Sequence, residues 1–209
     1  MSDDLWPAIH AERAALADEL GTLTDDQWRT RSLCGEWTVE EVVAHLTAAA
    51  GIGQFRWIRS MVGAGFNADK HNRRRLDEQR GATPAETLAR FRAVVTSRTA
   101  ASGHLPAWLG EVVVHGQDIR RPLGLPGTPS VDATTAVARF FAARNFTVAS
   151  RTAIEGLRLE ATDGPFTAGD GPLVTGTTLA LTMAMAGRSV FLDELTGPGV
   201  ETLRSRDSA

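Results

Sequence analysis

The chain has 209 residues, of which 43% are hydrophobic and 22% are charged, and its formal net charge is -3. This composition is ordinary for a globular protein, and the length suffices for one large domain or two modest ones. A weakly acidic chain has no general electrostatic attraction to nucleic acid or to membranes. We therefore expect a small molecule or another protein as partner, with no nucleic acid and no membrane.

Cysteine content and the first residues indicate the compartment. The single cysteine, Cys34, excludes an internal disulfide and fits a reducing environment. The first ten residues lack the basic and then apolar pattern of a signal peptide. The longest apolar stretch, residues 177–186, is too short to span a bilayer. We expect a cytoplasmic protein.

Hydrophobic spacing and capping patterns predict four helices in the first part of the chain. Capping boxes begin the second and third helices, at Thr38 and at Thr83, where a threonine is followed three residues later by a glutamate. A polar loop, residues 67–80, is expected between these two helices. In chain order, the four helices are predicted over residues 3–21, 38–62, 83–103 and 106–121.

The later part of the chain has a different pattern. Prolines and glycines interrupt residues 122–129, so we place a domain boundary near residue 126. Beyond it, periodicity predicts a helix, a half-buried strand over 156–162, a glycine-rich turn and another helix over 175–186. The expected fold is mainly α: a four-helix bundle in residues 1–126, followed by a small α/β domain in residues 127–209.

The predicted fourth helix contains the clearest chemical pattern. Glu111 and His115 lie four residues apart, so their side chains occupy adjacent turns of one helical side, near the apolar face. Burial of either group without a partner is costly, and a metal ion removes that cost. A simple intrahelical pair between the two side chains is the competing interpretation.

A third ligand has to come from another helix. His45 lies at the flank of the apolar stripe of the predicted second helix, where it can point between helices. Two histidines and one carboxylate would leave open coordination positions, as in catalytic metal sites. A surface histidine, or a hydrogen-bonded core histidine, is the alternative for His45.

Several segments together resemble the mycothiol-dependent maleylpyruvate isomerase family, a branch of the DinB-like metal proteins. Gly35–Leu46 resembles the second-helix motif of that family, and Glu111–Gly124 its fourth-helix motif. Weaker similarity to the sterol-carrier-like C-terminal domain of the family covers Ala168–Arg188 and Asp193–Val200.

The resemblance implies a zinc-type site with His45, Glu111 and His115 as ligands, and mycothiol, the low-molecular-weight thiol of actinobacteria, as cosubstrate. It also implies a functional arginine in the C-terminal domain. Arg188 is the candidate for this catalytic role, and a surface arginine after a helix is the other interpretation. A bound metal lowers the pKa of a thiol and delivers a thiolate at neutral pH.

Two functions follow from this pattern. The first is a mycothiol-dependent isomerase or S-transferase that adds a metal-activated thiolate to a small electrophile. The alternative is a non-catalytic, metal-containing binding or regulatory module for a small apolar ligand.

Other candidates have weaker support from the sequence. Asp118 is expected either to orient a ligand or to pair with Arg121, and Glu12 either to support the site or to lie at the bundle edge. The arginines at 73–75 could attract an anionic substrate or form a solvated loop. Cys34 precedes the second helix by several residues, so we expect it to lie apart from the metal.

Overall fold

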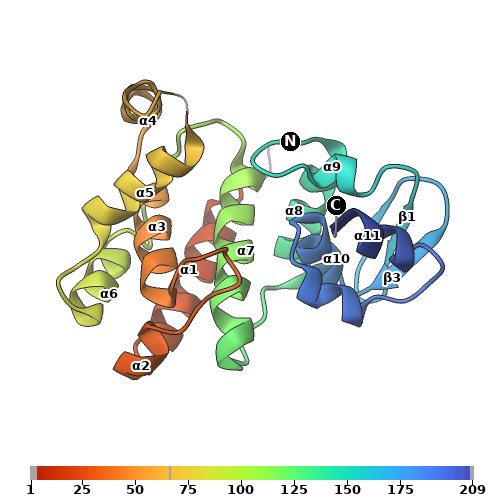
Figure 1. Ribbon diagram of the computed structural model, residues 1–209, viewed down its shortest axis with the longest axis horizontal. Helices are drawn as coiled ribbons and strands as arrows, with labels where there is room; N and C mark the ends of the chain where they lie inside the picture. Colours follow the sequence, from red (N-terminus) through yellow and green to blue (C-terminus); the bar gives the residue numbers. More distant parts are fainter. Residues whose placement is uncertain (1–3, 66, 208–209) are drawn as a thin grey trace. The chain divides into compact units, whose positions relative to one another are not determined.

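The computed structural model describes residues 4–65 and 67–207. It is mainly helical, with a small three-stranded mixed sheet near the C-terminus, which confirms the expected fold class (Figure 1). The chain divides into two compact units, one ending at Gly127 and the other beginning at Thr128. Within the described ranges, no helix combines the length and the apolar character needed to cross a bilayer.

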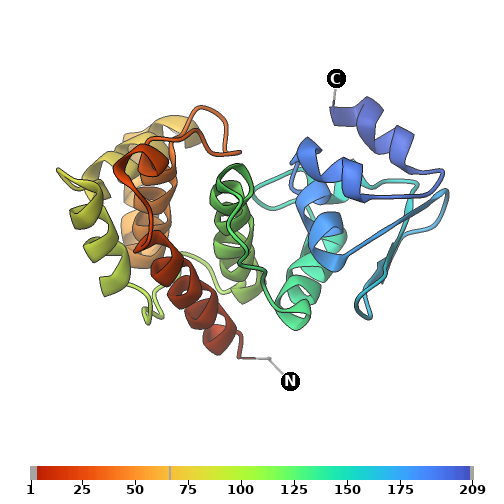
Figure 2. The same cartoon turned by 90° about the horizontal axis from the view of Figure 1, so that it is seen from below.

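Four helices form the bundle of the first unit. Both α1 (Trp6–Leu20) and α3 (Val39–Gly51) contact both α6 (Pro84–Ala93) and α7 (Leu105–Leu123), so the four helices close a ring around one core. In Figure 2, red α1 lies between yellow-green α6 and green α7. The core is formed by side chains that recur at helical spacing, among them Ile9, Leu16, Val42, Leu46, Phe91, Leu109 and Val113.

Local signals explain where the helices that surround the site begin and end. The predicted capping box of α3 is present: Thr38 Oγ1 accepts from the amide of Glu41, and the Glu41 carboxylate accepts from the amide of Thr38. The helix α7 stops at Gly124, whose φ of 62° is the left-handed conformation that glycine adopts at little cost. A partly buried ion pair of 2.7 Å between Arg120 and Glu19 connects α7 to α1.

The expectation of one long second helix over 38–62 is wrong. The helix α3 ends at Gly51, because Ile52 and Gly53 adopt extended backbone conformations, and a separate helix α4 (Gln54–Gly63) follows. The expected loop over 67–80 is also helical. It forms α5 (Ala68–Gln79), which begins where the Asn67 side chain accepts from the amide of Lys70 and which packs against α3.

The remaining helices of the first unit are short. The helix α2 (Asp25–Trp28) precedes the connector to α3, and α6 ends at Ala93, ten residues before the expected end near residue 103. Thr83 caps α6 as expected, but the Glu86 carboxylate accepts from the amide of Ala82 instead of completing a capping box. These differences leave the bundle intact, because α1, α3, α6 and α7 each bury apolar side chains in the common core.

The second unit is built from helices on a small sheet. Strand β1 (Arg158–Ala161) pairs antiparallel with β2 (Thr167–Ala168) and parallel with β3 (Leu173–Gly176). Helix α10 (Thr178–Met185) packs against α8 (Val131–Ala143) and contacts β1 and β3. The short helix α9 spans Ser150–Ala153, a 3-10 helix spans Ser189–Glu194, and the helix α11 spans Val200–Asp207.

Candidate metal centre

The structure brings His45, Glu111 and His115 together inside the bundle. His45 comes from α3, and the other two residues lie one turn apart on α7, which packs against α3. The Glu111 Oε1 atom is 2.7 Å from His45 Nε2 and 3.7 Å from His115 Nε2. One carboxylate oxygen thus lies between two imidazole nitrogens contributed by two helices.

These distances suit a metal ion. One ligand atom from each of the three residues lies within 4.8 Å of the other two. In a tetrahedral site with bonds of about 2.1 Å, two ligand atoms are about 3.4 Å apart. The two measured separations lie on either side of that value, so small rotations of the side chains suffice to surround an ion. Nitrogen and oxygen donors of this kind suit zinc and other divalent first-row metals.

Aromatic and polar neighbours fix the two imidazoles. The Trp37 ring lies 4.9 Å from the His45 ring, centroid to centroid, and the His45 and His115 rings meet edge to face at 5.0 Å. On the other edge of its ring, His115 Nδ1 donates to Asp118 Oδ2 at 2.9 Å. Asp118 is fully buried, so this bond sets the orientation of His115, as carboxylates often do beside metal-binding histidines. The structure thus supports the orienting role considered for Asp118.

The charge state of His115 follows from these contacts. Burial alone lowers its pKa, but the side chains of Asp118, Cys34 and Glu111 together raise the pKa of His115 to about 10. At neutral pH the ring therefore carries a proton on both nitrogens, and its positive charge lies among acidic neighbours. A divalent cation can replace one of these protons in the same surroundings, because the same oxygens stabilise either positive charge.

Two buried titratable side chains, Arg13 and His71, interact electrostatically with this centre. Arg13, on α1, is 4% exposed, and its guanidinium donates to the carbonyl of Ser97 at 3.0 Å. Burial lowers the pKa of Arg13 to about 10, and the negative charge of Glu111 partly opposes that shift. On α5, burial lowers the pKa of His71, and a backbone contact with Ser60 opposes this, while Arg75 and His45 lower it further.

Sequence reasoning missed the position of Cys34. We expected Cys34 to lie apart from the metal ligands, but its side chain contacts the imidazole of His115. The reason is a tight turn: the amide of Ser32 donates to the carbonyl of Trp37, and Gly35 has a φ of 57°. The glycine in this segment was the available signal for a chain reversal, and separation along the sequence was the wrong measure.

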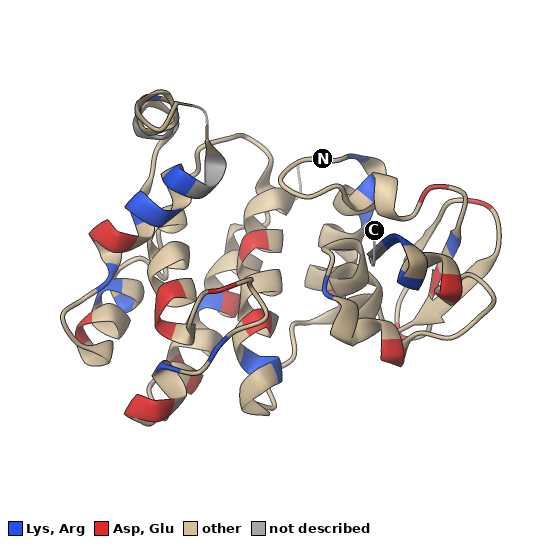
Figure 3. Ribbon diagram, viewed as in Figure 1, with Lys and Arg blue, Asp and Glu red and all other residues tan. Residues whose placement is uncertain are grey.

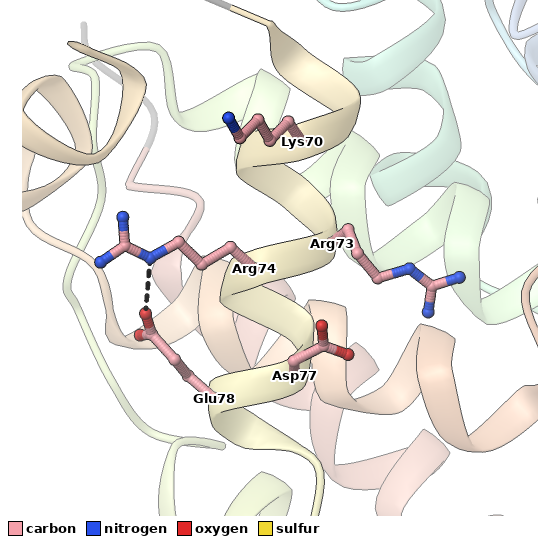
Figure 4. Close-up of a pocket in the computed structure, with 5 residues that line it drawn as sticks. All are labelled: Lys70, Arg73, Arg74, Asp77 and Glu78. Carbon is pink, nitrogen blue, oxygen red and sulfur yellow. Dashed lines mark ion pairs between the residues drawn. The ribbon is translucent and has the colours of Figure 1, made fainter. Parts of the chain in front are cut away.

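The basic run of α5 lies among acidic side chains. Along this helix the run of Lys and Arg is followed by Asp and Glu near the C-terminal end (Figure 3). A surface pocket of about 490 Å³ there is lined by residues of both signs, Lys70, Arg73, Arg74, Asp77 and Glu78 (Figure 4). Arg73 pairs with Glu41 at 2.5 Å, and Arg74 with Glu78 at 3.5 Å. The pocket includes none of the three candidate metal ligands.

The other candidates lie as follows. Glu12 is half-buried on α1. Arg188 belongs to the second unit, where it follows α10, and its Nη1 donates to the carbonyl of Ala186 at 2.7 Å. The three proposed metal ligands all belong to the first unit.

Comparison with known protein families agrees with this architecture. Residues 9–108 match the family model described as Mycothiol maleylpyruvate isomerase N-terminal domain. Most of the first unit is thus similar to this domain family. The matched segment includes His45 and ends three residues before Glu111, so the carboxylate and the second histidine of the site lie outside it.

Two solved structures share the fold. They are a mycothiol-dependent maleylpyruvate isomerase and a histidine-to-alanine mutant of such an enzyme, 18% and 17% identical to this chain. Each alignment covers 94% of this chain and 92% of the other, with a TM-score of 0.62. At this identity the likeness describes the fold alone. A comparison with curated proteins found no match.

Proposed function

We propose that the chain is a metal-dependent, thiol-utilising enzyme, an isomerase or an S-transferase that adds a thiolate to a small electrophile. The observation that supports it is the His45–Glu111–His115 cluster, with ligand atoms within 4.8 Å of one another in a partly buried place. Three protein ligands leave a further coordination position open, which a catalytic centre needs and a structural one does not. The domain family and the shared fold suggest mycothiol as the thiol and zinc as the ion.

Each residue has a defined part in the proposal. His45, Glu111 and His115 hold the ion, and Asp118 keeps Nε2 of His115 directed toward it by bonding Nδ1. Trp37 limits the rotation of the His45 ring. A bound divalent ion supplies a Lewis acid that lowers the pKa of a coordinated thiol. Arg188 is the proposed catalytic residue of the second unit. Because the thiol has to stay reduced, the proposed activity belongs in a reducing compartment such as the cytoplasm.

The metal content of the purified protein tests the first part of the proposal. Protein purified without chelator should contain about one divalent metal per chain by elemental analysis, a stoichiometry set by one three-ligand cluster. A content below about a tenth of an ion per chain, even after reconstitution, would remove the metal site from the proposal.

The thiol is tested in the Cys34→Ser protein, where the internal thiol is absent. Adding mycothiol to the cobalt-substituted variant should produce a near-ultraviolet sulfur-to-cobalt charge-transfer band. If cobalt binds but millimolar mycothiol leaves the spectrum unchanged, water is the activated ligand, and the chain is a hydrolase instead of a thiol-dependent enzyme.

A further inference from the structure

A short loop before α3 delivers the one thiol of the chain to α7. The amide of Cys34 donates to Ser32 Oγ at 3.1 Å, and the amide of Trp37 donates to the carbonyl of Cys34 at 3.2 Å. The loop is attached to α7 because the amide of Leu33 donates to the backbone carbonyl of Asp118 at 3.0 Å. Backbone contacts on both sides of Cys34 therefore fix its position beside α7.

Cys34 completes a second cluster of metal-binding side chains. One ligand atom each from Cys34, His115 and Asp118 lies within 4.8 Å of the other two. Asp118 is fully buried, and Cys34 and His115 are partly buried. Sulfur, nitrogen and oxygen donors together suit zinc, cobalt and cadmium, whereas magnesium and manganese prefer oxygen ligands.

The two clusters share one imidazole. His115 Nε2 faces Glu111 and His115 Nδ1 lies 2.9 Å from Asp118, so Glu111 and Asp118 lie against different nitrogens of the ring. A neutral imidazole has one lone pair for a metal, and its other nitrogen holds a proton. The neutral ring can therefore coordinate an ion in one cluster or in the other. Coordination in both clusters at once would require an imidazolate, which has no proton on either nitrogen.

We propose that Cys34, His115 and Asp118 form a second metal position, next to the first, that holds a thiophilic divalent ion through the protein's own thiolate. On binding, the Cys34 thiol gives its proton to solvent, and a sulfur–metal bond forms without any oxidation. The two positions compete for one ion through His115. Softer metals favour Cys34, and harder metals favour the cluster that contains His45. This inference concerns metal binding and is independent of the proposed enzymatic activity.

Cobalt spectroscopy without any added thiol tests the proposal. The metal-free wild-type protein should develop a sulfur-to-cobalt charge-transfer band on titration with Co²⁺. The His45→Ala variant, which lacks a ligand of the first position only, should keep that band. The Cys34→Ser variant should lose the band and still show the visible bands of cobalt bound at the first position. No charge-transfer band in either wild-type protein or His45→Ala would overturn the second position.

The same titration separates the two metal proposals. If the first position is wrong, Cys34→Ser binds no cobalt, while the charge-transfer band of the wild-type protein is unaffected. If the second position is wrong, Cys34→Ser and wild-type protein give the same spectrum. If Asp118→Asn keeps the sulfur-to-cobalt band and its cobalt affinity is unchanged, Asp118 is not a ligand of the second position.

Alkylation of the wild-type protein gives a test that needs no variant. Cys34 is the only cysteine, so the uptake of iodoacetamide by thiol reports on that residue alone. Zn²⁺ or Cd²⁺ should slow alkylation in proportion to occupancy and stop it at saturation, whereas Mg²⁺ should have no effect. Unchanged alkylation at saturating Cd²⁺ would refute a bond between Cys34 and the metal.

Discussion

At the scale of single residues, the centre is a balance of buried charges. Glu111 lies between two imidazoles, and Asp118 and Cys34 contact the far side of His115. Buried carboxylates are costly unless they are paired, so the site needs a positive charge, which a proton on His115 or a metal ion provides. A substitution that removes one of the proposed ligands should therefore affect metal binding far more than it affects folding.

The His45→Ala substitution tests this expectation. It should weaken zinc binding by about 100-fold or more, because even residues that only orient ligands contribute about 10–100-fold. The helical content should be unchanged, since the bundle core is apolar and His45 lies at its margin. Competition with a chelating indicator measures the affinity, and circular dichroism measures the helicity. His115→Ala should behave in the same way.

The matched control is His104→Ala, which removes an exposed histidine just before α7. It should bind zinc as the parent does. Equal affinity in His45→Ala and in His104→Ala would show that the ligand assignment is wrong.

Local patterns indicated the proposed ligand residues more clearly than they indicated the side chains around them. Glu111 and His115 could be recognised because both lie on one helix, where spacing determines the side that they share. The contact between Cys34 and His115 depends on a turn and on a hydrogen bond between Leu33 and Asp118, which are far apart along the chain. Such long-range contacts are set by packing, and a single sequence shows no period that would indicate them.

At the scale of elements, the start of α3 positions His45. Thr38 and Glu41 exchange two hydrogen bonds, and Glu41 also pairs with Arg73 of α5. Thr38→Ala should lower the free energy of unfolding by about 1 kcal/mol, because it removes a side-chain cap. Urea denaturation of the first helical unit measures this. Thr22→Ala, in an exposed connector, is the control and should cost less.

The same cap makes stability depend on pH. Burial by itself raises the pKa of Glu41, but hydrogen bonds from the Thr38 backbone and from Arg73 lower it below its ordinary value of 4.5. A carboxylate with a lowered pKa stabilises the folded state fully above its ordinary value, and this contribution is lost as the pH falls through the folded value.

Glu41→Gln should therefore be less stable than the parent near neutral pH and should approach it in acid, below the ordinary pKa of 4.5. Denaturation midpoints at a series of pH values measure the difference. Glu36→Gln, which alters an exposed pair with Arg31, should follow the parent across the whole range. A constant difference between Glu41→Gln and the parent would exclude the titration of Glu41 as its cause.

The capping signals were predictable from sequence, and the path of the chain between α3 and α6 was not. Thr38 and Thr83 identify helix starts through local chemistry. By contrast, α5 is rich in charged residues and resembles a loop, although Leu76 is fully buried and the helix packs on α3. Tertiary packing stabilises such a helix, so its own composition does not indicate it.

At the scale of the whole molecule, the proposed metal site lies entirely within the first unit. The three proposed ligands lie before Gly127, and unit two begins at Thr128. A protein truncated after Gly127 should keep its metal, because its core and its ligands are its own. It should lose the proposed thiol-dependent activity, to which Arg188 is proposed to contribute.

Elemental analysis and a turnover assay test the two halves of this prediction. The matched control is the full chain with Arg188→Ala, which should bind metal as the parent does and turn over more slowly. Full activity in the truncated protein would refute a catalytic role for the second unit and for Arg188.

The prolines and glycines over 122–129 could be recognised as a boundary region, since they interrupt helical periodicity. The arrangement of the small sheet could not be predicted. One strand was expected over 156–162, and β1 confirms it. Its partners are short: β2 lies in the expected glycine-rich turn, and β3 lies between that turn and α10. Strand pairing depends on contacts between segments, and two- to four-residue strands have too few positions to show alternation.

The distance along the chain between His45 and Glu111 has a mechanical consequence. A metal bound to both residues closes a loop of 66 residues. When the two ends of the protein are pulled apart, that loop cannot lengthen until a ligand bond breaks. While the ion is bound, about 220–240 Å of contour length could not extend. The ion would thus act as a releasable clasp, and its rupture would appear as a separate step in the extension of the chain.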